Sequence, residues 1–161
     1  MAKHKEEKTN VMRILEQKKI PYTAHSYPHG DEAVDGVTVA RITGQDPAKV
    51  FKTLVAAGAS KRVYVFGIPV AAELDLKNAA KAVGEKSIAM VKVNELLALT
   101  GYVRGGCSPV GMKKPYPTVF HRAATDCETI FVSAGKIGAQ IEAKPAELLA
   151  VIGAETADII V

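Results

Sequence analysis

One short apolar segment holds a lysine where a lysine is not expected. In Val50–Leu54, Lys52 lies inside a strand-like run. An ammonium group in such surroundings costs free energy unless a partner or a bound anion compensates for it. Strand alternation places Lys52 and Leu54 on the same face, so the pattern fits a pocket wall and a half-exposed surface strand equally well.

A second segment, the loop 105–114, is rich in glycine and carries polar groups. Glycine permits close approach and left-handed backbone, so the successive N–H groups of Gly105 and Gly106 can converge on an anion or a developing oxyanion. Ser108 adds a hydroxyl, and Lys113 and Lys114 add positive charge. The loop matches neither a Walker A pattern nor a dinucleotide fingerprint, and a plain connector also fits it. Together with Lys52 it suggests a pocket for a substrate that carries a phosphate and a carbonyl.

Two further positions could border such a pocket. Ser133 follows an apolar strand and opens a turn of small residues that includes Gly135. Strand ends of this kind often border a site, although a hairpin with a capping serine fits as well. Tyr27 supplies an aromatic ring that could stack on a base or close a pocket.

Cys107 is the nucleophile that the loop offers. Cysteine catalysis needs a base within hydrogen-bond reach, and His25, His29 and His121 have no local spacing that ties them to Cys107. A small, buried loop residue is therefore the favoured interpretation of Cys107.

Composition places the chain among ordinary globular proteins. Its 161 residues, 48% hydrophobic and 24% charged, are most simply one domain. The net charge of +4 weakly favours anionic partners. Cys107 and Cys127 share no metal-binding spacing, so we expect free thiols, no metal and no cofactor. Without a signal peptide or a membrane-spanning stretch, we expect a cytoplasmic protein that does not enter a membrane.

Periodicity, caps and turn residues predict the elements that must position these groups. We expect a flexible tail at 1–8 and one domain at 9–161, of the α+β class, with a mixed, largely antiparallel sheet surrounded by helices. The predicted helices begin at Thr9 or Asn10 (ending before Pro21) and cover Thr38–Thr43, Asp75–Val83, Val93–Thr100 and Pro145–Ile152, with a further helical start at Asp46-Pro47. The predicted strands are Tyr22–Tyr27, Phe51–Ala57, Arg62–Val70, Ser87–Val91, Thr118–Phe120, Thr129–Ser133, Gln140–Ala143 and an edge strand, Asp158–Val161.

Several motifs resemble, in order, those of the YbaK/EbsC family, free-standing relatives of the editing domain inserted in prolyl-tRNA synthetases. The resemblance spans about Val11 to Ile160. The matching stretches are Phe51–Leu54, Leu74–Lys81, Gly101–Pro109, Lys113-Lys114 and Val132–Lys136.

The resemblance implies a strongly curved sheet and assigns roles to matched positions. Lys52, beside Thr53, would be the essential lysine, and the Gly105 amide would steady the reacting carbonyl. Substrate-binding positions would be Tyr27, Thr53, Gly106, Ser108, Ser133 and Gly135. Positions for tRNA would be Arg104, Lys113, Lys114 and Lys136. This sequence departs from the family pattern at Cys107, at Ala134 and at Gln140, which stands where related sequences commonly place an aspartate.

By resemblance, the activity is hydrolysis of cysteine mischarged onto proline tRNA, with aminoacyl-tRNA as the partner and prolyl-tRNA synthetase as a candidate second one. The cysteinyl sulfur of the substrate would attack its own ester carbonyl, a lyase-like step if a thiolactone leaves. Two alternatives stay open. The same site could cleave alanyl or another small aminoacyl ester with water, or the chain could be a non-catalytic RNA-binding or regulatory module.

Overall fold

The computed structural model describes residues 8–30 and 32–161. Its order of elements confirms the α+β prediction. The helices are α1 (Asn10–Gln17), α2 (Gly36–Thr43), α3 (Leu76–Val83), α4 (Val93–Thr100) and α5 (Pro145–Ile152), with 3-10 helices η1 (Pro47–Lys49) and η2 (Arg122–Asp126). The strands are β1 (Thr23–Ser26), β2 (Phe51–Gly58), β3 (Val63–Pro69), β4 (Ile88–Met90), β5 (Thr118–His121), β6 (Ile130–Ser133), β7 (Ala139–Ala143) and β8 (Glu155–Ala157).

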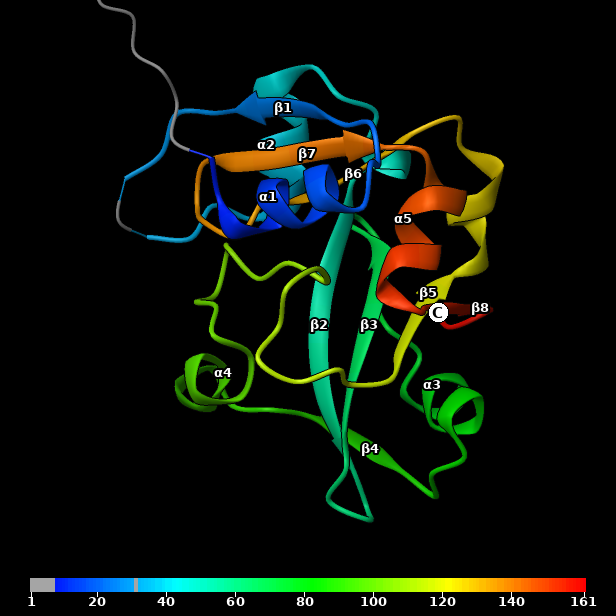
Figure 1. Cartoon of the computed structure of the whole chain (residues 1–161). Coiled ribbons are helices and arrows are strands. Elements are labelled where there is room, and N and C mark those ends of the chain that lie inside the picture. Colours follow the sequence, from blue (N-terminus) through cyan, green and yellow to red (C-terminus); the bar gives the residue numbers. More distant parts are fainter. Residues whose placement is uncertain (1–7, 31) are drawn as a thin grey trace, which may run out of the picture.

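The strands form two sheets, which Figure 1 shows one above the other. The smaller sheet has the order β1-β7-β6 and is antiparallel, and the larger has the order β4-β2-β3-β5-β8. In the larger sheet β2 pairs antiparallel with β3 and β4, whereas β5 pairs parallel with β3 and β8. A single parallel bridge between Val50 and Phe131 connects the two sheets at the start of β2. β2 therefore runs from the small sheet to the far end of the large one.

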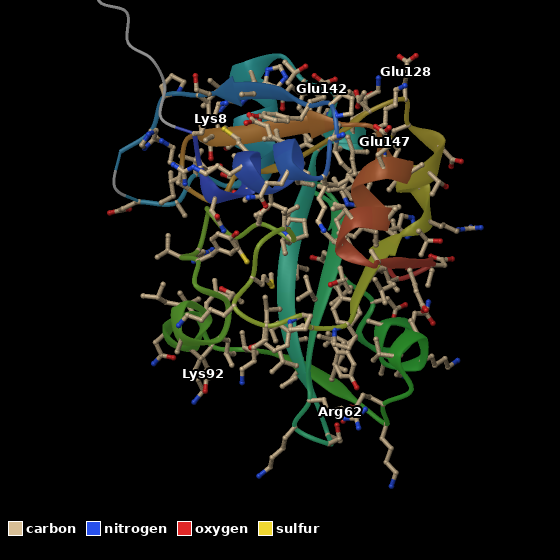
Figure 2. The ribbon with its side chains drawn as sticks, viewed as in Figure 1. Lys8, Arg62, Lys92, Glu128, Glu142 and Glu147 are labelled. Atoms are coloured by element: carbon tan, nitrogen blue, oxygen red, sulfur yellow. The ribbon has the colours of Figure 1, made fainter. Side chains whose placement is uncertain are left out.

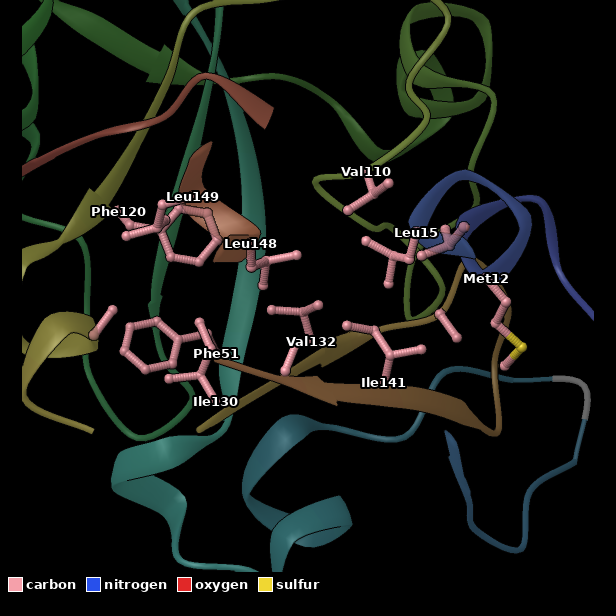
Figure 3. Close-up of a cluster of buried hydrophobic side chains, with 14 of the residues drawn as sticks. Met12, Leu15, Phe51, Val110, Phe120, Ile130, Val132, Ile141, Leu148 and Leu149 are labelled. Carbon is pink, nitrogen blue, oxygen red and sulfur yellow. The ribbon is translucent and has the colours of Figure 1, made fainter. Parts of the chain in front are cut away.

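The main core holds the small sheet, α1 and α5 together. Figure 3 shows Leu15 of α1 facing Ile141 of β7, while Leu148 of α5 lies near Val132 of β6. All four side chains are buried. Phe51, at the start of β2, stacks on Phe120 of β5 with ring centroids 5.8 Å apart. Because burial of apolar surface is the dominant folding force, this cluster fixes the start of β2 against both sheets.

Helix ends follow local chemistry. Asp35 caps α2 and Asp75 caps α3, each accepting hydrogen bonds from backbone N–H groups of the first turn. Gly84 and Gly101, in left-handed conformation, follow α3 and α4, where the sequence predicts their ends. Both ends of α3 are thus specified by residues that are neighbours in sequence.

One predicted strand is wrong. Residues 158–161 were expected as an edge strand, but the strand is β8, three positions earlier, which pairs with β5. The apolar residue Ile159 is fully buried among β2, β3 and α3, and Ile160 makes only an isolated bridge with Leu74. The apolar pattern of residues 158–161 therefore reflects burial in the core and not pairing with a neighbouring strand.

The expected tail at 1–8 lies outside the described residues except for Lys8, whose Nζ lies 2.9 Å from Glu16 Oε1 on α1. Figure 2 places Lys8 above α1. Among residues 8–30 and 32–161, no helix has the length and apolar character needed to cross a membrane.

Candidate functional site

A cavity of about 970 Å³ lies along the start of β2. Residues 50–54 line it from β2, and residues 32–37 line it from the segment that leads into α2. The loop after α4 contributes 103–105 and Cys107, and the β6–β7 hairpin contributes Ser133, Ile137, Ala139 and Gln140. Segments far apart in sequence therefore meet at the start of β2.

Lys52 is half-buried and lines this cavity, which decides between the two positions that strand alternation left open. Its neighbour Phe51 points into the core, so alternation holds at the strand start. Within the described residues no carboxylate lies within ion-pair distance of Lys52. Its ammonium is thus available to an anionic or strongly polar group in the cavity.

Gly105 lines the cavity and must be glycine on two grounds. Its φ is +87°, and a Cβ there would lie 2.7 Å from the Cβ of Ala33. The Gly105 N–H makes no hydrogen bond within the described residues. One backbone amide is therefore free to act on a ligand.

Contrary to the sequence prediction, the N–H of Gly106 does not converge with that of Gly105 on the cavity. Its N–H donates to the carbonyl of Val103 at 3.0 Å, and it is not among the residues that line the cavity. A Cβ on Gly106 would lie 2.9 Å from the Cα of Lys136. Gly106 thus packs the loop against the β6–β7 hairpin and leaves Gly105 as the exposed amide.

Tyr27, Thr53 and Ser133 also line the cavity, as their predicted roles would require. The Ser133 Oγ accepts a hydrogen bond from the N–H of Gly135 at 3.1 Å, which leaves the hydroxyl hydrogen free to donate. The Tyr27 ring is nearly buried, and its backbone N–H donates to Gly138. These side chains add hydroxyl groups to the cavity wall.

Ser108 and Gly135 do not line the cavity. Ser108 is fully buried, and its Oγ accepts a hydrogen bond from the N–H of Val110 at 3.2 Å. Gly135 acts through the bond that holds Ser133. Direct contact with substrate is therefore not the role their positions favour.

Of the four basic residues expected to meet tRNA, only Arg104 lines the cavity. Lys113, Lys114 and Lys136 lie outside it. The Lys113 Nζ donates to the carbonyl of Ala98 at 3.4 Å, and Lys114 borders a second cavity of about 270 Å³.

Cys107 lines the cavity but is poorly suited to attack. Burial raises the pKa of its thiol to about 12, so at pH 7 the side chain is held as the neutral thiol, which is a poor nucleophile. None of the described histidines lines the cavity. His25 contacts Glu142, and His121 accepts from the N–H of Ile159. The buried-residue interpretation of Cys107 agrees with this geometry.

The sequence missed some wall residues. Gln140 was noted only as a departure, yet its nearly buried side chain lines the cavity. Asp35 and Gly36 lie just before the predicted helix Thr38–Thr43 and were not singled out, although the spacing of Asp35 from Thr38 is that of a helix cap. Hydrogen bonds from Thr38 hold the pKa of Asp35 below its usual value. Val93 and Leu97 add an exposed apolar side on α4.

The histidines, cysteines and carboxylates of the described residues form no group of three that could hold a metal ion. What the cavity offers instead is an ammonium, a free backbone amide, and hydroxyls beside an apolar wall. Such groups can bind a polar ester and stabilise charge on its carbonyl oxygen.

Comparisons with known proteins identify the family of this chain. The model of the family described as "Aminoacyl-tRNA editing domain" matches residues 31–151. A protein of Enterococcus faecalis (strain ATCC 700802 / V583), named "Putative Cys-tRNA(Pro)/Cys-tRNA(Cys) deacylase EbsC", is 43% identical over 160 residues, which cover 99% of this chain and 98% of that protein.

Solved structures show the same fold. One, described as "a putative trans-editing enzyme for prolyl tRNA synthetase", has a TM-score of 0.80 and 27% identity, with 94% of each chain covered. Another, of a hypothetical protein, has a TM-score of 0.85 at 22% identity and covers 94% of this chain and 99% of that one. With three quarters of its length matched by the family model, this chain belongs to the aminoacyl-tRNA editing domain family.

Proposed function

We propose that this protein is an aminoacyl-tRNA deacylase that removes cysteine mischarged onto proline tRNA, acting in trans. The observation that carries the proposal is one cavity holding the Lys52 ammonium, the free Gly105 N–H and the Ser133 hydroxyl. The name of the Enterococcus faecalis relative, a deacylase of Cys-tRNA(Pro) and Cys-tRNA(Cys), supports the substrate.

The site favours a reaction in which the substrate supplies its own nucleophile. The cysteinyl sulfur attacks the ester carbonyl, the bond from the carbonyl carbon to the ribose oxygen breaks, and the thiol proton passes to that oxygen. The products are free tRNA and a cysteine thiolactone, which water opens to cysteine. Such an intramolecular attack needs orientation more than a protein nucleophile, because proximity alone is worth several kcal/mol.

The chain's own groups then have distinct tasks. Lys52 holds the phosphate or ribose end of the terminal nucleotide as a point charge. The Gly105 N–H donates to the carbonyl oxygen as negative charge develops there. The buried, protonated Cys107 takes no part in bond making, since its raised pKa keeps it as a thiol.

The test compares cysteinyl-, alanyl- and seryl-charged proline tRNA. We expect release of cysteine but not of serine, because a hydroxyl is too weak a nucleophile to replace the thiol. Lys52→Ala should reduce cysteine release at least 100-fold, whereas Cys107→Ser should retain most of it. Lys77→Ala, on the exposed side of α3, is the matched lysine control and should match the unaltered protein.

Other results would change the assignment. Loss of activity in Cys107→Ser would favour a protein nucleophile. Efficient release of alanine or serine would favour water as nucleophile and a broader substrate range. Absence of cleavage of any charged tRNA by the unaltered protein would favour a binding module. Repeating the assay with prolyl-tRNA synthetase present tests whether the synthetase is a partner.

A further inference from the structure

Gln140 is a nearly buried carboxamide at the wall of the cavity. It lies on β7, the central strand of the small sheet, and only 5% of it is exposed. Its Cα is paired with that of Ser133 on β6, so the two side chains share one face of the sheet. Both line the cavity, which places the carboxamide beside the Ser133 hydroxyl.

Gln45, from the link between α2 and η1, orients this carboxamide. The Gln45 Nε2 donates to the Gln140 Oε1 at 2.9 Å. The Gln45 Oε1 is buried and has no partner in the part of the chain that the structure describes. Reversing both amides would leave a buried NH₂ unpaired instead of a carbonyl oxygen, and orphaned buried donors are the rarer case. The observed orientation is therefore the favoured one.

This orientation directs the NH₂ of Gln140 at the cavity. Its Nε2 makes no hydrogen bond within residues 8–30 and 32–161, yet it is not among the fully buried atoms that lack a partner. It therefore keeps contact with open space, and the side chain lines the cavity. A hydrogen-bond donor, held by a neighbour, faces the space where a substrate would lie.

The reaction needs such a donor. A carbonyl oxygen that gains charge is usually stabilised by two hydrogen bonds, and side-chain amides serve this purpose as well as backbone N–H groups. Gly105 supplies one N–H, but the N–H of Gly106 is already committed to Val103. We propose that the Gln140 carboxamide is the second donor to the ester carbonyl oxygen and that Gln45 is its positioning residue. This inference rests on the proposed function, because it requires that an aminoacyl ester is cleaved in this cavity.

The first test uses charged tRNA and the intact protein. Gln140→Leu should lower kcat about 100-fold with little change in KM, since the lost bond strengthens in the transition state. Gln45→Leu should also lower kcat, but by less than Gln140→Leu does. The double variant should equal Gln140→Leu alone, because Gln45 acts only through Gln140. Gln17→Leu, exposed at the end of α1, is the matched control and should change nothing.

A second test measures the pH dependence of kcat, which would not change if Gln140 had only a structural role. Gln140→Glu keeps the shape, but a carboxyl can donate only when it is protonated. Burial favours the neutral form, so kcat of Gln140→Glu should rise toward that of the unaltered protein as pH falls from 7 to 5. Cleavage by the unaltered protein and by Gln140→Leu should show no such rise.

Two results would overturn the inference while leaving deacylation intact. One is a Gln140→Leu variant that folds and keeps its kcat, and the other is a Gln140→Glu variant whose activity does not recover at low pH. If Gln140→Leu does not fold, the pH profile of Gln140→Glu decides alone. Failure of the unaltered protein to cleave charged tRNA would instead overturn the proposed function.

Discussion

At the scale of single residues, two adjacent glycines do different work. Gly105 lines the cavity, its N–H has no hydrogen-bond partner among the described residues, and its positive φ keeps the loop close to Ala33. Gly106 is buried against the backbone of Lys136 and Ile137. The first glycine serves the proposed chemistry, and the second holds the loop in place so that the first can act.

Gly106→Ala should therefore destabilise the protein. The new Cβ would lie 2.9 Å from the Cα of Lys136 and 3.0 Å from the Ile137 nitrogen, both backbone atoms that cannot move aside alone. Overpacking of this kind costs about 1–3 kcal/mol, which urea unfolding would measure. Gly30→Ala is the control, because nothing lies within 4 Å of a Cβ there. Equal stability of the two variants would contradict the packing role of Gly106.

At the scale of elements, Glu142 ties the three strands of the small sheet together. Its carboxylate, on β7, contacts the His25 Nε2 of β1 at 2.9 Å and accepts a hydrogen bond from Thr129, which directly precedes β6. Figure 2 shows Glu142 on the small sheet. These bonds, that of Thr129 first, hold the pKa of Glu142 below its usual value.

A lowered carboxylate pKa makes part of the stability depend on pH. The contribution is fully present above the unfolded pKa of Glu, about 4.3, and is lost as pH falls through the lower folded value. Thr129→Val should thus cost about 1 kcal/mol at pH 7 and clearly less at pH 3, measured by urea unfolding at both. In Thr125→Val, which removes a bond only to the carbonyl of Arg122, the loss should be the same at both pH values. A pH-independent loss in Thr129→Val would refute the role of the carboxylate.

At the scale of the whole molecule, positive charge gathers on segments that border the cavity. Arg104 lines it, Lys113 and Lys114 follow the same loop, and Lys136 lies on the hairpin that packs against Gly106. With a net charge of +4, the chain can attract the phosphates of a tRNA through these basic residues.

Salt should therefore weaken the reaction with tRNA. If Lys113 and Lys114 each meet a phosphate, replacing both with glutamine should reduce the slope of log kcat/KM against log salt by about 0.7 to 0.9 for each phosphate that is no longer neutralised. Lys77→Gln with Lys81→Gln is the matched pair on α3, which Figure 1 shows on the other side of the β2–β3 hairpin from α4. An equal change of slope in both pairs would mean that only net charge matters.

Most of the secondary structure could be predicted because it is specified by neighbours in sequence. Asp75 and Gly84 mark the two ends of α3 through hydrogen bonds and backbone angles that need no distant partner. The apolar run that begins at Phe51 likewise predicts β2 from residues that are neighbours in sequence. The strand expected at 158–161 failed because apolar residues there, such as Ile159, are buried by packing and not by strand pairing.

The sequence by itself determined the class of fold, the helix ends, and the short list of polar residues from which a site could be built. Tertiary structure alone decided which of them meet. It left the Gly105 N–H without a partner among the described residues, paired the Gly106 N–H with the carbonyl of Val103, and buried Cys107. It also brought Gln45 within hydrogen-bond distance of Gln140, 95 positions away in sequence. The physical reason is that burial and long-range hydrogen bonds depend on how the two sheets pack around β2. A local pattern of residue types does not specify which distant residues this packing brings together.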